Sequence, residues 1–246
     1  MGCCNFGLSY SGMTHIGLRR KNEDAFAYLE ENNFSIVADG MGGHRAGKKA
    51  AETTVWVIST LIQSLFASSK KDWTLSELMT LNNRYIQDAN RWIHHLGQNR
   101  EEYKGMGTTV CTLLIYKRFL IYAHVGDSRI YRLRNGCLEQ LTSDHSLKNA
   151  RIQHNQMRTK SSICTHILTQ AIGIKKCVNP DIKMGTVKPG DQYLLCTDGL
   201  SLVTEEEIAE VLTDAKTTEA ATKTLIDLAN KKKGGDNVTA IVIRVN

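Results

Sequence analysis

The sequence predicts an α+β fold, in which antiparallel strands and paired helices form one domain over residues 1–246. Three observations support this prediction. Short runs of β-branched and aromatic residues follow one another closely, and longer stretches carry apolar residues at helical spacing. Strands and helices do not alternate in the regular βαβ order that is typical of a parallel sheet. No internal repeat divides the chain, and no linker rich in proline or glycine is visible.

The first half of the chain contains strands, then helices, then strands again. The predicted elements lie at 25–30, 33–39, 46–66, 75–96, 108–116, 118–127 and 128–136. The second of these runs, "NFSIVAD", stops at Asp39 immediately before a glycine-rich stretch. The last three runs are separated by short links, and this pattern predicts an antiparallel meander.

The second half begins with a polar stretch, 146–166, that lacks a clear period and is predicted to be irregular. The run "DQYLLCTDGL" (191–200) is another strand that ends in an Asp-Gly pair. A helix is predicted to begin after Thr204, because Glu207 three residues later completes a capping box. A further helix and a final strand are predicted at 218–231 and 238–245.

Composition and charge exclude several classes of protein. The net charge of +6 is spread along the chain, and no basic patch interleaved with aromatic residues indicates a nucleic-acid partner. The seven cysteines form no C-x-x-C pair and no zinc spacing, which is typical of reduced thiols in the cytoplasm. Neither a secretory signal peptide nor an apolar run long enough to span a bilayer is visible. We therefore expect a cytoplasmic monomer.

Acidic residues stand at the ends of several predicted strands. They are Glu23, Asp24, Asp39, Asp127, Asp198 and Asp236. A single Asp-Gly at a strand end is more often a turn than a ligand. Several carboxylates that meet at one rim of a sheet, however, repel one another unless they are protonated or bridged by cations. Oxygen ligands select Mg²⁺ or Mn²⁺, and two such ions about 4 Å apart can activate a hydroxide against a phosphoryl group.

Seven motifs in this sequence together resemble those of one family. In order they are "RRKNEDAF", "VADGMGGHRAG", "GMGTTV", "HVGDSRIYRL", "LTSDHSL", "LLCTDGLS" and "GGDNVTAIVI", and they span residues 15–245. The family is that of the metal-dependent Ser/Thr protein phosphatases of type 2C, in their compact bacterial-like form. The resemblance implies a four-layer αββα sandwich with two antiparallel sheets flanked by helices. It also implies phosphorylated proteins as partners, including a Ser/Thr kinase.

The resemblance further implies a binuclear Mg²⁺ or Mn²⁺ site, in which a hydroxide bound to both ions attacks phosphoserine or phosphothreonine directly. Asp39 would bridge the two ions. Asp198 and Asp236 would complete one coordination shell, and Glu23 with the carbonyl of Gly40 would complete the other.

Further residues would support this site. Arg19 matches the residue that binds phosphate, and Asp127 matches a ligand of a third, weaker ion. Asp24 would hold metal-bound waters from behind, and Asn237 would orient the acid that precedes it. His44 is the candidate general acid for the leaving group, with a water on a metal ion as the alternative.

Two departures from the family pattern limit what can be carried over. Met41 stands where some relatives have a histidine after the first Asp-Gly. The segment 147–171, which aligns with the family's substrate flap, lacks the usual His-Pro and has Gln170 where arginine is usual. The sequence therefore leaves two alternatives open, a degenerate module that binds phosphoproteins without turnover and a phosphatase of the same fold that acts on small phosphoesters.

Overall fold

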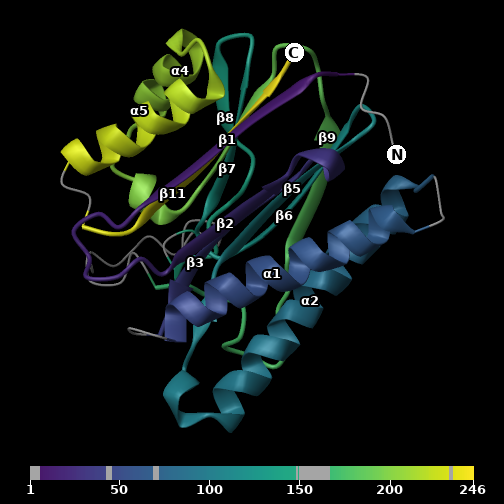
Figure 1. Cartoon of the computed structure of the whole chain (residues 1–246), viewed down its shortest axis with the longest axis vertical. Coiled ribbons are helices and arrows are strands. Elements are labelled where there is room, and N and C mark those ends of the chain that lie inside the picture. The colour runs from purple at the N-terminus through teal and green to yellow at the C-terminus, as the bar shows by residue number, and fades with distance from the viewer. Residues whose placement is uncertain (1–5, 43–45, 69–71, 148, 150–166, 233–234) are drawn as a thin grey trace.

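Two antiparallel sheets lie face to face between two pairs of helices (Figure 1). This computed structural model describes residues 6–42, 46–68, 72–147, 149, 167–232 and 235–246. Helices α1 and α2 cover one sheet, and helices α4 and α5 cover the other. The α+β class and the four-layer αββα sandwich that the sequence predicted are confirmed.

The sheet under α1 and α2 follows the order β2-β3-β5-β6-β9, with β4 paired to β3. Its strands are β2 (Asp24–Leu29), β3 (Phe34–Met41), β4 (Gly107–Thr108), β5 (Val110–Tyr116), β6 (Phe119–Val125) and β9 (Asp181–Thr186). The other sheet follows the order β1-β11-β10-β7-β8. Its strands are β1 (Leu8–His15), β7 (Arg129–Arg134), β8 (Cys137–Gln140), β10 (Gln192–Cys196) and β11 (Val238–Val245).

The helices agree with the predicted stretches. In the described part of the chain they include α1 (Ala46–Ala67), α2 (Leu75–Asn99), α4 (Glu205–Asp214) and α5 (Thr218–Lys231), with short 3-10 turns η1 (Glu30–Asn32), η2 (Glu101–Tyr103) and η3 (Asp198–Leu200). The predicted capping box is present, because Thr204 Oγ1 accepts from the Glu207 N–H and the Glu207 carboxylate accepts from the Thr204 N–H. A capping residue of this kind stabilises a helix by about 1 kcal/mol.

The central strands are buried on both faces, which explains why their sequences read as almost continuous apolar runs. In β5, Leu113 and Ile115 pack between the two sheets, whereas Val110 and Leu114 pack under the helices. Successive side chains of a strand point to opposite faces, so one strand contributes to two cores.

The predicted meander is correct for β5 and β6 but wrong for β7. Strands β5 and β6 pair over their full length, whereas β7 pairs with β8 and β10 in the other sheet. The chain changes sheets at Gly126, whose φ of +107° lies in a region that glycine adopts readily. The turn "RNG" instead links β7 to β8, with positive φ at Asn135 and Gly136 as a tight hairpin requires.

Helix α1 is long and apolar enough to cross a membrane by length and composition alone. In this fold it packs on β2, β3 and α2, and Ile58 and Ile62 contribute to the core beneath it. We therefore interpret α1 as a core helix.

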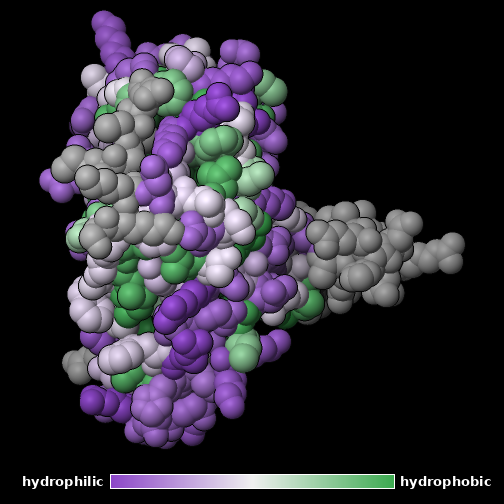
Figure 2. All heavy atoms as spheres, turned by 90° about the vertical axis from the view of Figure 1, so that its right-hand side faces the viewer, coloured by the Kyte–Doolittle hydropathy of each residue, from purple (hydrophilic) through white to green (hydrophobic). Residues whose placement is uncertain are grey.

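The face shown in Figure 2 carries hydrophobic residues in separate patches among hydrophilic ones.

Candidate metal centre

Strand ends from both sheets meet at one edge of the sandwich and line a cavity of about 1380 Å³. Eight residues that the sequence singled out border this cavity. They are Arg19, Glu23, Asp39, Gly40, Asp127, Asp198, Asp236 and Asn237. Asp24 lies buried behind the cavity, opposite Asp39 in the β2–β3 ladder. His44 and most of the segment 147–171 fall outside the described residues.

Asp39 lies at the centre of this cluster. Burial raises the pKa of its carboxyl group well above the usual value, and the negative charges of Asp24 and Asp198 raise it further. The side chain of Asp198 is therefore close enough to Asp39 to affect its protonation. On the other side, the backbone of Asp39 is fixed, because its N–H donates to Thr109 Oγ1 at 3.0 Å and its carbonyl accepts from the Thr108 hydroxyl at 2.8 Å.

Asp24 is held by two threonines from the other sheet. Its Oδ2 accepts hydrogen bonds from Thr197 Oγ1 at 2.9 Å and from Thr239 Oγ1 at 2.6 Å. Its Oδ1 is buried and has no hydrogen-bond partner in the described part of the chain. Burial raises the pKa of Asp24 to about 7 despite these threonine bonds, and the charge of Asp198 adds to the effect.

Two glycines bring Glu23 and the end of β3 together. A Cβ atom at Gly40 would lie 2.2 Å from the carbonyl oxygen of Gly47, so the end of β3 can approach α1 only without a side chain. A Cβ at Gly47 would lie 2.8 Å from Glu23 Oε1 and 2.8 Å from the Gly40 carbonyl oxygen. These two oxygens therefore lie close to the same point, and Glu23 Oε1 is buried without a hydrogen-bond partner in the part of the chain that the structure describes.

Asn237 connects the loop before β2 to the start of β11. Its side-chain oxygen accepts from the Glu23 N–H at 2.8 Å, and its Nδ2 donates to the carbonyls of Ile16 and Lys21, both at 2.8 Å. Its own backbone N–H donates to Asp236 Oδ1 at 2.8 Å. This one residue fixes the loop that carries Glu23 and also orients the carboxylate of Asp236.

Arg19 reaches the cavity from the same loop. Its Nη2 forms a salt bridge with Asp236 Oδ2 at 2.7 Å, and its Nε donates to the Gly235 carbonyl at 3.0 Å. The Arg19 side chain is 58% exposed, so it has N–H groups left to donate to an anion in the cavity.

Asp127 also lines the cavity, from the turn that follows β6. Burial raises the pKa of its carboxyl group to about 7, and the charges of Asp198 and Asp144 contribute. Asp127 is therefore a further member of the acidic cluster, in which the carboxyl pKa values of Asp24 and Asp39 are also raised.

The residues present fit divalent cations. Carboxylates that face one another under burial require protons or cations, and buried oxygens of Glu23 and Asp24 have no hydrogen-bond partner among the described residues. Among the described acids of the cluster, every candidate ligand atom is an oxygen, the type that Mg²⁺ and Mn²⁺ prefer.

Three supporting residues were missed at the sequence level. Thr197 and Thr239 hold Asp24, and Gly47 makes room for Glu23. The position of Thr197 directly before Asp198 was the available signal, since a hydroxyl beside an acid at a strand end can bond a neighbouring carboxylate.

Known proteins resemble this chain over almost its whole length. The family model for protein phosphatase 2C matches residues 11–232. The protein phosphatase PhpP of Streptococcus pneumoniae is 36% identical over 247 residues, which cover 97% of this chain and 98% of that protein. The Streptococcus agalactiae serine/threonine phosphatase superposes with a TM-score of 0.88 at 37% identity, covering 98% of this chain and 100% of that one.

A second solved structure bears on the metal centre. It is the catalytic domain of the serine threonine protein phosphatase PstP, in complex with two manganese ions. It superposes with a TM-score of 0.83 at 31% identity and covers 98% of this chain and 99% of that one.

Proposed function

Because this chain belongs to the protein phosphatase 2C family, we propose that it is a phosphoprotein phosphatase that hydrolyses phosphoserine and phosphothreonine with Mg²⁺ or Mn²⁺. The observation that carries the proposal is the convergence of Asp39, Asp198 and Asp236 on one cavity with Glu23. These acids come from positions far apart in the chain. Without a cation, the repulsion between their negative charges would destabilise the fold.

The acids would divide into two sets of ligands, one for each ion. Asp39 is central enough to serve both, with Asp198 and Asp236 completing one shell. Glu23 Oε1 and the Gly40 carbonyl oxygen converge beside Gly47 and would serve the other. When bound, the two ions supply Lewis acidity that lowers the pKa of water and neutralises charge on the phosphoryl group.

The other residues of the chain would bind and orient the substrate and its surroundings. Arg19 would donate N–H groups to the phosphoryl oxygens, because a guanidinium fork matches their geometry. Asp24, held by Thr197 and Thr239, would accept hydrogen bonds from water behind the ions through its unpartnered Oδ1. Asp127, which approaches Asp198, would hold a weaker third ion.

The test is hydrolysis of a phosphopeptide and of p-nitrophenyl phosphate, with Mn²⁺ and with EDTA. We expect turnover that requires Mn²⁺ and that Asp39→Asn and Asp236→Asn reduce by at least about 100-fold. Asp227→Asn on the exposed face of α5 is the matched control and should retain full activity.

Other outcomes would overturn the proposal. Turnover in EDTA, or full activity in both variants, would exclude the metal mechanism. Phosphopeptide binding without turnover would favour a binding module, and hydrolysis of small phosphoesters alone would favour a different substrate class.

A further inference from the structure

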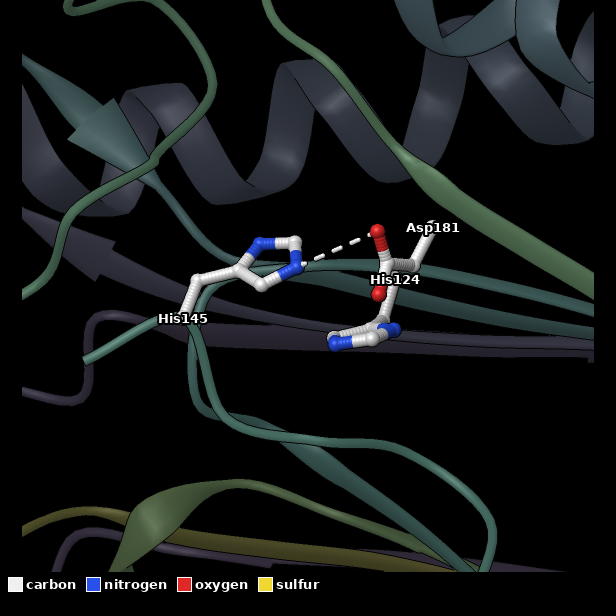
Figure 3. A group of neighbouring side chains, drawn as sticks. All are labelled: His124, His145 and Asp181. Atoms are coloured by element: carbon white, nitrogen blue, oxygen red, sulfur yellow. Dashed lines mark ion pairs between the residues drawn. The ribbon is translucent and has the colours of Figure 1, made fainter. Parts of the chain in front are cut away.

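Three side chains from separate elements meet beside the turn that carries Asp127. Figure 3 shows His145, from the loop after β8, pointing toward Asp181 at the start of β9, with the ring of His124 from β6 next to both. His145 Nε2 lies 3.6 Å from Asp181 Oδ1, and the two imidazole rings are 4.4 Å apart between centroids. Their potential ligand atoms all lie within 4.8 Å of one another, so the group could in principle be a metal site or a positioning device.

The hydrogen bonds of His145 decide between these possibilities. Its Nδ1 faces the Gly126 N–H at 3.3 Å and the Gln170 Nε2 at 3.5 Å. The orientation of the Gln170 amide is set by its oxygen, which accepts from the Asn179 N–H at 2.9 Å. Both groups next to Nδ1 are therefore donors, so Nδ1 bears the lone pair and Nε2 carries the proton toward Asp181.

A metal ion would need the opposite arrangement. Coordination through His145 Nε2 would move the proton to Nδ1, where it would point at the Gly126 N–H. The Nε2 of His124 is not available as a ligand either, because it lies 2.9 Å from the Ser143 carbonyl oxygen and must donate its proton to it. The donors around the ring thus favour the tautomer of His145 that accepts at Nδ1 and faces Asp181 through Nε2–H.

This tautomer allows His145 to fix the backbone of Gly126. His145 holds this glycine twice, since its own N–H donates to the Gly126 carbonyl at 2.9 Å and its Nδ1 accepts from the Gly126 N–H. On the other side, a Cβ at Gly126 would lie 2.6 Å from Thr109 Cγ2, so the turn has little room to shift in that direction. Asp127 follows directly and shares the constraint.

We propose that His145 is a positioning residue that holds the Gly126–Asp127 turn, so that the Asp127 carboxylate is presented to the cavity beside Asp198. Asp181 supports this role by facing the Nε2 proton, which leaves Nδ1 as the acceptor. The inference rests on the proposed function, in which Asp127 holds the weakest of the bound ions. His145 itself does not border the cavity.

The test compares Mn²⁺ binding by the full chain, measured from the EPR signal of free Mn²⁺, in four proteins. They are the unchanged protein and the variants Asp127→Asn, His145→Asn and His145→Phe. Asparagine can place an oxygen where Nδ1 lies, whereas phenylalanine keeps the volume of the ring and removes the acceptor. Unfolding temperatures in EDTA are measured in parallel.

We expect Asp127→Asn to remove the weakest class of Mn²⁺ site. His145→Phe should weaken that class about 5- to 10-fold, as expected for one lost hydrogen bond, and leave the tighter sites unchanged. His145→Asn should bind as the unchanged protein does. If His145→Phe does not fold, His145→Ala is compared with His145→Asn in the same way.

Each contrary result has a distinct meaning. Unchanged weak binding in His145→Phe, or equal losses in the phenylalanine and asparagine variants, would overturn the inference and leave the proposed function intact. An Asp127→Asn protein that binds as many ions as the unchanged one would overturn both the inference and the third-ion assignment. Binding of a Zn²⁺ ion that Asp181→Asn abolishes and Asp127→Asn retains would overturn it in favour of a metal site.

Discussion

Replacing Asp24 by asparagine should stabilise the protein in the absence of divalent cations. The Asp24 side chain is buried, and its pKa is raised from 3.8 to about 7, first by burial and then by neighbouring acids. In the unfolded chain the group ionises above pH 3.8, whereas in the folded protein it keeps its proton up to about pH 7. Unfolding then releases a proton between these values, so the stability of the unchanged protein falls as the pH rises through this window.

The magnitude follows from the size of the shift. A rise from 3.8 to about 7 is about 3 pKa units, and at 1.36 kcal/mol each it costs the folded protein about 4 kcal/mol above pH 7. Asparagine has the same shape and no charge to bury. Four kilocalories is an upper bound, because a neutral amide accepts the Thr197 and Thr239 hydrogen bonds less strongly than a carboxylate does.

The assay is urea unfolding in EDTA at pH 4 and pH 8. We expect Asp24→Asn to match the unchanged protein at pH 4 and to exceed it at pH 8 by roughly 1 to 4 kcal/mol. Addition of Mn²⁺ should reduce or reverse the difference, because an ion that binds only the folded state stabilises the protein with the intact cluster more. Asp227→Asn serves as the exposed control. An Asp24→Asn protein that is no more stable than the unchanged one at pH 8 would refute the reasoning.

Three further predictions address phosphate binding, space at the metal centre and the opposite end of the sandwich. Arg19→Ala should raise the phosphopeptide KM by about 10-fold, with Mn²⁺ binding retained by EPR; lost Mn²⁺ binding would show that the residue mainly holds its acidic partner. Gly47→Ala should weaken Mn²⁺ binding about 10-fold by crowding two oxygens proposed as ligands, whereas Gly185→Ala, whose Cβ would meet nothing within 4 Å, should have no effect. Asp191→Asn should cost about 3 kcal/mol in urea unfolding at pH 7 by leaving Arg134 without its carboxylate, with unchanged activity per folded molecule. Burial alone would raise the pKa of Asp191, but hydrogen bonds from Arg134, Lys188 and Tyr193 lower it below its usual value. The stability difference between Asp191→Asn and the unchanged protein should therefore shrink as the pH falls below 3.8.

Central elements were predicted from sequence better than edges. Apart from the two-residue strand β4, the strands that the sequence did not reveal are β1, β8 and β9, and each of them lies at the edge of a sheet. Edge strands are buried on fewer sides, so they need no continuous apolar run. In β1 the segment from Ser9 to Thr14 mixes glycine, serine and threonine, and β9 exposes Met184. The assignment of β7 to the wrong sheet has a different origin, because a change of sheet at Gly126 depends on packing between distant strands rather than on local pattern.

The acidic cluster was predictable because its members stand at strand ends and in family motifs. The residues that hold it were less visible. Thr239 lies 215 positions from Asp24, and the distance in sequence gives no sign that their side chains meet. The hold of Asn237 on the loop of Glu23 likewise spans 214 positions. Such contacts exist only once both sheets are packed.

Local pattern alone also fails to separate a structural acid from one that binds a cation. Asp191 and Asp236 both follow a glycine and precede an apolar strand, yet their surroundings differ. Asp191 is almost fully buried and accepts hydrogen bonds from Arg134 at 2.6 Å, from the Lys188 N–H at 2.8 Å and from the Tyr193 hydroxyl at 2.9 Å, and its pKa is lowered. At the other edge of the sandwich, Asp24 is also buried, but one of its oxygens has no hydrogen-bond partner among the described residues, and its pKa is raised. A buried carboxylate whose oxygens all accept hydrogen bonds from the protein stabilises the fold. A buried carboxylate that lacks such partners requires a proton or a cation instead. That contrast, more than the presence of acids at strand ends, supports the proposal that divalent cations bind at the edge where Asp24 lies.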